Sequence, residues 1–177
     1  MREALEEAKR ATEAAWQAVK VSETTAINQL RAYVGPVDFE IMFTESNEIL
    51  VAFKIKNTGQ TPAINVQLAY CITFLELPID DSDVDIDAQI LDEEQASAFL
   101  PKDVTFSAKT DVLNDYDTTK KILCLQGTHA VFVYGKVAYK DIYGQPRTTK
   151  FRVAWGKSFR NTQLKNMALC DDGNEMT

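Results

Sequence analysis

The chain lacks most of the residues from which enzyme active sites are built. Its 177 residues include one histidine, His129. A single histidine removes most zinc and iron sites and most histidine-dependent triads. The nucleotide-binding patterns GxxxxGK[S/T] and GxGxxG and the hydrolase pattern GxSxG do not occur. We therefore predict a non-catalytic protein without a cofactor. Carboxylate-based hydrolysis stays open as the alternative, because the sequence alone does not exclude it.

Cysteine is also scarce. Cys71, Cys124 and Cys170 are widely spaced and form no CxxC pair. This pattern fits neither a disulfide framework nor a zinc site. We expect free thiols in a reducing compartment. One bridge between Cys71 and Cys124 is the alternative.

Long apolar runs and excess positive charge are missing as well. No stretch of about 18 apolar residues occurs, and the N-terminus lacks the apolar segment of a secretory signal. These absences predict a soluble chain without a transmembrane segment. The net charge of −7 makes nucleic acid an unlikely partner.

The N-terminal region is rich in alanine, and residues 2–34 contain neither glycine nor proline. This composition predicts one long helix over residues 1–34, ended by Gly35 and Pro36. Small residues recur at steps of three or four and form a narrow stripe that buries little area, so the isolated helix would be marginal. We expect a strut that contacts another protein or a second copy. Its predicted contact residues are Trp16, which lies off the stripe, Val19 and Leu30.

After residue 36 the hydrophobic period changes from 3.6 to 2. Alternation over residues 37–43, 49–55 and 64–74 predicts strands. The odd-numbered side chains of the first two runs and the even-numbered ones of the third should face the core. Residues 130–139 and 148–155 form a predicted hairpin.

Short runs at residues 104–106 and 122–125 bring the total to about seven strands with no helix between them. This order predicts a mainly β fold, an antiparallel sandwich over residues 35–160. It contains an acidic insertion at residues 77–101. A polar tail, residues 161–177, is expected to be frayed.

Three segments carry a resemblance to known proteins. They are the turn from Lys56 to Ala63, the helix end at residues 30–34, and residues 134–144 leading into Thr148–Phe151. The chain resembles a group of uncharacterised bacterial and prophage proteins in which a membrane anchor leads through an alanine-rich helix into an immunoglobulin-like domain. The resemblance covers most of residues 20 to 155. It implies an immunoglobulin-like sandwich and an adaptor linked to the bacterial envelope or membrane through its N-terminal helix.

The acidic insertion is a weak candidate for a metal site. Asp81, Asp83, Asp85 and Asp87 alternate as in a calcium loop. An EF-hand is excluded, because Ile86 stands where the loop needs glycine and Asp92 where it needs glutamate. We expect a solvated acidic loop, and a looser calcium site is the alternative.

Positive charge gathers on the closing hairpin. Lys136 and Lys140 on one strand, and Lys150 and Arg152 on the next, share the phase opposite to the core-facing residues. Like charges side by side on a sheet repel each other unless an opposite charge lies nearby. We predict that this basic face recognises something anionic, in the first place the chain's own acidic loop. Phospholipid head groups, an acidic protein and a merely solvated face are the alternatives.

Overall fold

The computed structural model describes residues 2–44, 48–79, 97–110, 113, 117–159 and 165–177. The chain divides into two compact units, Met1–Arg31 and Ala32–Thr177. The first unit is the helix α1 (Arg2–Leu30). Among the helices in the described ranges, none is long and apolar enough to cross a membrane.

The end of α1 corrects the predicted boundary at residue 34. The helix ends at Leu30, and Gly35 and Pro36 lie inside the first strand. The cause is burial, because Ala32 and Val34 are fully enclosed in the sandwich core. Alternate buried residues need the two-residue period of a strand, so the backbone extends before the proline is reached.

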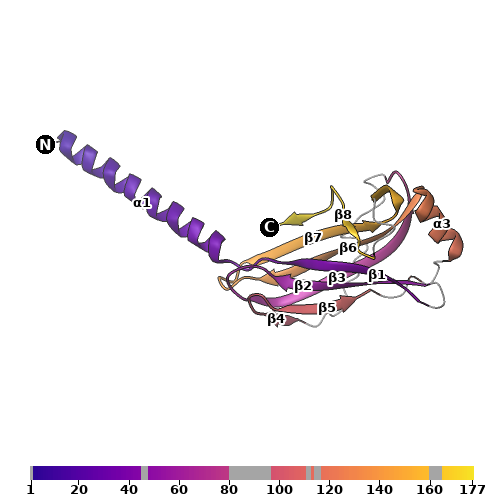
Figure 1. Ribbon diagram of the computed structural model, residues 1–177. Coiled ribbons are helices and arrows are strands. Elements are labelled where there is room, and N and C mark those ends of the chain that lie inside the picture. Colours follow the sequence, from indigo (N-terminus) through magenta and orange to yellow (C-terminus); the bar gives the residue numbers. More distant parts are fainter. Residues whose placement is uncertain (1, 45–47, 80–96, 111–112, 114–116, 160–164) are drawn as a thin grey trace. The chain divides into compact units, whose positions relative to one another are not determined.

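The second unit consists of two antiparallel sheets (Figure 1). The smaller sheet has the order β1-β2-β5, and the larger has the order β4-β3-β6-β7-β8, with β9 also paired to β7. The elements are β1 (Val34–Phe43), β2 (Ile49–Asn57), β3 (Ala63–Glu76), β4 (Ala98–Leu100), β5 (Thr105–Lys109), α3 (Thr118–Gln126), β6 (His129–Lys140), β7 (Pro146–Trp155), the 3-10 turn η2 (Lys157–Phe159), β8 (Ala168–Leu169) and β9 (Glu175–Met176).

The sheets pack face to face around aromatic side chains. The Phe53 ring of β2 lies 5.9 Å from Phe151 of β7 and 5.5 Å from Tyr70 of β3, centroid to centroid. This contact between the layers confirms the predicted mainly β sandwich. Its immunoglobulin-like identity stays a prediction.

The predicted alternation holds for most of the core. All four odd-numbered residues of 49–55 are buried, and the even-numbered residues from Val66 to Phe74 pack on the same cluster. Ile64 and Phe43 are exposed instead. Both lie at strand ends, where the opposite layer gives less cover.

A second apolar cluster lies on the other face of the larger sheet. Its buried members include Phe132, Tyr134 and Cys170, and Cys71 packs against them. Burial, followed by the neighbouring Cys71 thiol, raises the pKa of Tyr134 well above its ordinary value. All three cysteines are free, so the alternative Cys71–Cys124 bridge is absent.

The run at residues 122–125 is helical, which corrects the prediction of a strand. It lies in α3, whose N-cap Asp117 accepts a hydrogen bond from the Lys120 backbone N–H at 2.8 Å. Gly127 ends the helix in the left-handed conformation at φ 88°. The two caps define a short helix, and the apolar run fills one turn within it.

The C-terminal tail is paired to the sandwich, so its predicted fraying is wrong. β8 and β9 both pair with β7. Between them, the Asn174 side chain accepts a hydrogen bond from the Arg152 backbone N–H at 3.0 Å. The tail therefore covers the outer edge of β7, which would otherwise present unpaired backbone groups.

The side-chain amide of Asn57 joins four segments of the second unit. Its Oδ1 accepts from the backbone N–H groups of Tyr33 at 3.3 Å and Gly59 at 3.0 Å. Its Nδ2 donates to the carbonyls of Thr61 at 2.8 Å and Leu100 at 3.1 Å. The residue is fully buried, and all four hydrogen-bonding positions of its amide are used.

Replacing Asn57 should destabilise the sandwich strongly. Asn57→Ala leaves two donors and two acceptors without their partner, and we expect a loss of about 3–5 kcal/mol of unfolding free energy. Chemical denaturation followed by tryptophan fluorescence measures it. Gln60→Ala is the matched control, because it removes an exposed amide from the same turn and should change the stability little. Equal stability of Asn57→Ala and the parent chain would contradict this role.

Candidate functional site

The first candidate surface is the exposed apolar face of α1. Exposed fractions are 70% for Trp16, 56% for Val19 and 48% for Leu30. Leu5, at 59%, lies on the same side as Trp16, whereas Val21, at 66%, lies toward the opposite side of the helix. The first unit is this helix alone, so it offers these side chains no tertiary packing of its own.

Trp16 stands between two shallow hollows of the helix surface. Ala11, Thr12 and Ala15 line one with Trp16 and Val19. The other is lined by Glu13, Trp16, Gln17, Val19, Lys20 and Glu23. The floor of small residues in the first hollow leaves room for a bulky side chain of a partner.

The second candidate surface is the predicted basic face. Lys136 and Lys150 lie directly opposite each other in the β6–β7 pairing. Arg152 pairs with Tyr134 further along the same ladder, and Lys140 lies at its other end as an exposed residue. The structure thus brings Lys136 and Lys150 together, whereas Lys140 and Arg152 lie to either side of them.

The C-terminal tail covers part of this basic face. Glu175 of β9 pairs with Lys150. A Cβ atom added at Gly173 would lie 3.2 Å from the Cβ of Arg152, so the tail backbone packs on the arginine stem. Lys136 and Lys150 each take part in a further interaction. Within the described residues, the strand pairing thus places one acid of the tail, Glu175, beside the basic face.

Arg152 also acts on the buried thiol beside it. Burial raises the pKa of Cys170, and the positive charge of Arg152 opposes that rise. The Cys170 backbone N–H donates to the Arg152 carbonyl at 3.0 Å. The tail therefore contacts both the backbone and the side chain of Arg152. Arg152 thus contributes to the contact with the tail more than to an open binding surface.

The structure describes the surroundings of His129 but not those of the predicted metal ligands. Asp81, Asp83, Asp85 and Asp87 lie outside the described residues. Among the residues that are described, no group of three potential metal ligands occurs. The His129 ring stacks on Phe74 at 4.8 Å, and its Nδ1 lies 3.1 Å from the Thr128 hydroxyl. These contacts are those of a packed surface histidine.

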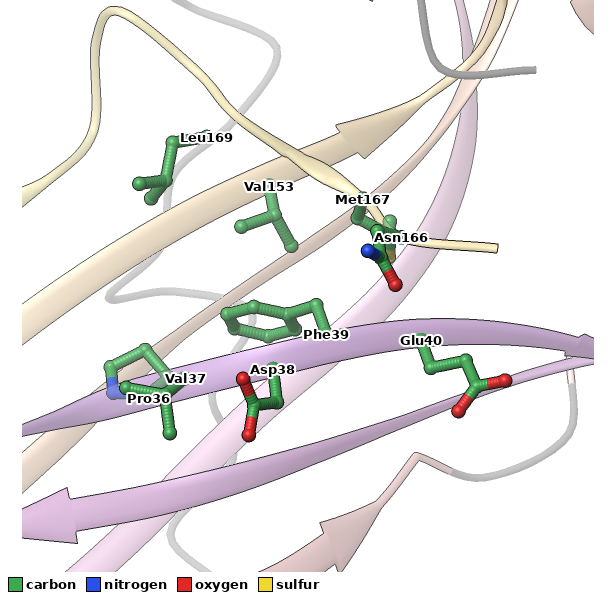
Figure 2. A pocket seen from close by; sticks show the side chains of 9 residues that line it. All are labelled: Pro36, Val37, Asp38, Phe39, Glu40, Val153, Asn166, Met167 and Leu169. Carbon is green, nitrogen blue, oxygen red and sulfur yellow. The ribbon is translucent and has the colours of Figure 1, made fainter. Parts of the chain in front are cut away.

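Sequence reasoning missed a groove of about 560 Å³ between β1 and the tail (Figure 2). Its lining residues are Pro36, Val37, Asp38, Phe39, Glu40, Val153, Asn166, Met167 and Leu169. A shift of the β1–β2 register between Val37 and Glu40 opens it, and Asp38 has φ 54° there. The alternating pattern of residues 37–43 gives no sign of that irregularity.

The acids at the groove already have cationic neighbours. Asp38 accepts from the Lys54 ammonium at 3.0 Å, and Glu40 lies 3.8 Å from that of Lys165. The rest of the lining is mostly apolar. The groove can therefore hold an apolar group, but it assembles no set of residues for acid–base chemistry.

Fold and surfaces define a class of protein: a two-layer antiparallel β protein led by a long helix. Within that class, the chain belongs to the DUF8453 family, whose domain is described as one of unknown function and matches residues 8–158. The match begins inside α1 and ends before β8, so the family domain includes most of the helix and leaves out the tail strands. No curated protein and no solved structure was found to match the chain.

Removing the tail should uncover the basic face. A chain that ends at Cys170 loses Asp171, Asp172 and Glu175 together with β9. We expect several-fold stronger binding to anionic phospholipid vesicles at low salt, and its loss at high salt. Vesicle sedimentation measures both.

The control is the full chain with Asp171→Asn, Asp172→Asn and Glu175→Gln. It removes the same acids and keeps the strand pairing, so it should gain less binding than the truncated chain. Vesicle binding that is unchanged by truncation would show that the tail does not mask the basic face.

Proposed function

We propose that the protein is a non-catalytic assembly module, in which α1 binds a partner polypeptide and the sandwich is the body so attached. The observation that carries the proposal is the exposure of large apolar side chains along a helix that forms a unit by itself. Trp16 is the largest of them and is 70% exposed.

The energetics of an isolated helix support this proposal. Helices gain most of their stability in proteins from tertiary packing of an apolar face, and their intrinsic propensity alone is marginal in water. The ion pair in α1 that joins the Lys9 ammonium to the Glu6 carboxylate at 3.9 Å adds little, because both side chains are largely exposed. A partner that covers the apolar face would supply the missing packing.

The side-chain chemistry also favours binding over catalysis. His129 is engaged with Phe74, and the acids at the groove face lysines. The buried acid Asp141 accepts from the backbone N–H groups of Tyr143 and Gln145 and pairs with Arg147 at 3.0 Å. That carboxylate organises the β6–β7 turn, so its hydrogen-bonding capacity is used structurally.

A truncation tests the proposal. The second unit begins at Ala32, which is buried, so the shortened chain should start there and keep the segment that leads into β1. In an extract of the producing cells, we expect the full chain to migrate in a larger particle and the shortened chain at the size of a folded monomer. Size-exclusion chromatography with immunodetection measures this.

Circular dichroism and thermal unfolding of the shortened chain are the control for its fold. If the full and shortened chains both migrate as monomers in the extract, α1 has no partner and the proposal is wrong.

A further inference from the structure

We infer that the partner of α1 is the α1 helix of a second copy, aligned antiparallel about a two-fold axis at Trp16, so that Lys9 of each chain faces Glu23 of the other. This inference rests on the proposed function, since it names the polypeptide that α1 binds.

Four residues of α1 follow one line along the helix at intervals of seven: Lys9, Trp16, Glu23 and Leu30. Seven residues are close to two helical turns, so side chains at this interval lie on the same side. Trp16 and Leu30 on the line are exposed apolar residues, and Lys9 and Glu23 are exposed charges. The apolar anchor Trp16 is thus flanked by a cation on one side and an anion on the other.

Antiparallel symmetry makes this line complementary to itself. A two-fold axis at Trp16 sets each residue of one helix opposite a residue of the second helix. The two residues are equally far from Trp16 in the sequence, one before it and one after it. Lys9 lies seven residues before Trp16 and Glu23 seven after it. Two oppositely charged pairs therefore form, one on each side of the tryptophans, and antiparallel helix dipoles are compatible with that alignment.

A parallel pairing lacks this complementarity. With the helices in register, Lys9 would lie level with Lys9 and Glu23 level with Glu23, so like charges would approach each other. Charge therefore selects the antiparallel alignment over the parallel one.

The surface beside Trp16 also suits a second copy. Ala11, Thr12 and Ala15 form the small-residue floor of the hollow next to the indole. In the antiparallel pair this floor lies close to the partner's Trp16, whose bulky ring needs such room. The tryptophan and the hollow are both supplied by the same face, as an isologous interface requires.

Charge reversal tests the register on the full purified chain. Sedimentation equilibrium should find a dimer of the 19.9 kDa chain. Lys9→Glu and Glu23→Lys should each weaken the dimer about tenfold, because each turns two exposed attractive pairs into repulsive ones. The double variant Lys9→Glu/Glu23→Lys should recover the parent affinity.

Mixing the two single variants gives the sharpest readout. In the mixed dimer, Glu at position 9 of one variant faces Lys at position 23 of the other, and the retained Glu23 and Lys9 face each other at the opposite end. Both pairs are attractive, so the mixture should dimerise better than either variant alone. The two positions are about 21 Å apart within one helix, so an intrahelical effect cannot produce this rescue. Arg10→Glu is the matched control: it makes the same charge change at an exposed position that lines neither hollow, level with Ser22 of the second copy, and the dimer should be unchanged.

Two results would overturn the inference. A full chain that stays monomeric at the highest soluble concentration excludes the second copy as partner, whereas the particle size in cell extract decides the proposed function separately. A dimer that ignores both charge reversals and shows no rescue on mixing excludes this register. A dimer of parallel helices would also give this second result, because charge reversal leaves like charges facing each other. Two helices that continue from anchors in the same membrane would have to be parallel.

Discussion

The buried amide of Asn57 is the contact on which the second unit depends. It lies at the end of β2 in the smaller sheet, and its Nδ2 donates to Leu100 of β4, in the larger one. Its Oδ1 accepts from Tyr33, just before β1 begins. A buried amide with all its positions used tolerates little displacement, so one side chain fixes the turn after β2, the start of β1 and the distance between the two layers.

The segment that leads out of α1 is held by further contacts of the same kind. The Tyr139 hydroxyl donates to the Ala32 carbonyl at 3.2 Å, and the Thr149 hydroxyl donates to the Val34 carbonyl at 2.6 Å. Both donors belong to the larger sheet, whereas Val34 itself pairs in the smaller one. Residues 32–34 are therefore bound by both layers. If α1 binds a partner as proposed, residues 32–34 connect that partner to the core of the sandwich.

The sequence predicts the core well and the boundaries poorly, for physical reasons. Only one strand register buries the apolar side chains of residues 49–55, because a shift by one residue would expose all four of them. Ala32 and Val34, by contrast, suit a helix stripe and a strand alike. Their burial in the core, together with the hydrogen bonds from distant Tyr139 and Thr149, decides between the two. For α3 the signals were present, since Asp117 and Gly127 are typical caps, but a four-residue apolar run does not reveal its period.

The candidate sites divide in the same way, into features that depend on local sequence and features that depend on distant contacts. Exposure of Trp16 could be predicted, because it lies off the stripe of a local helix, and Lys136 facing Lys150 follows from strand phase. The cover of Arg152 could not, since it depends on Asn174 reaching the edge of β7 across a polar tail. That cover closes the backbone edge of β7 to other strands. Attachment by strand addition at β7 thus requires the tail to leave, whereas the large apolar side chains of α1 are already exposed. A lone helix gains its stability only when that face is covered, so α1 should become more helical as it binds, and assembly and local folding should be one coupled equilibrium.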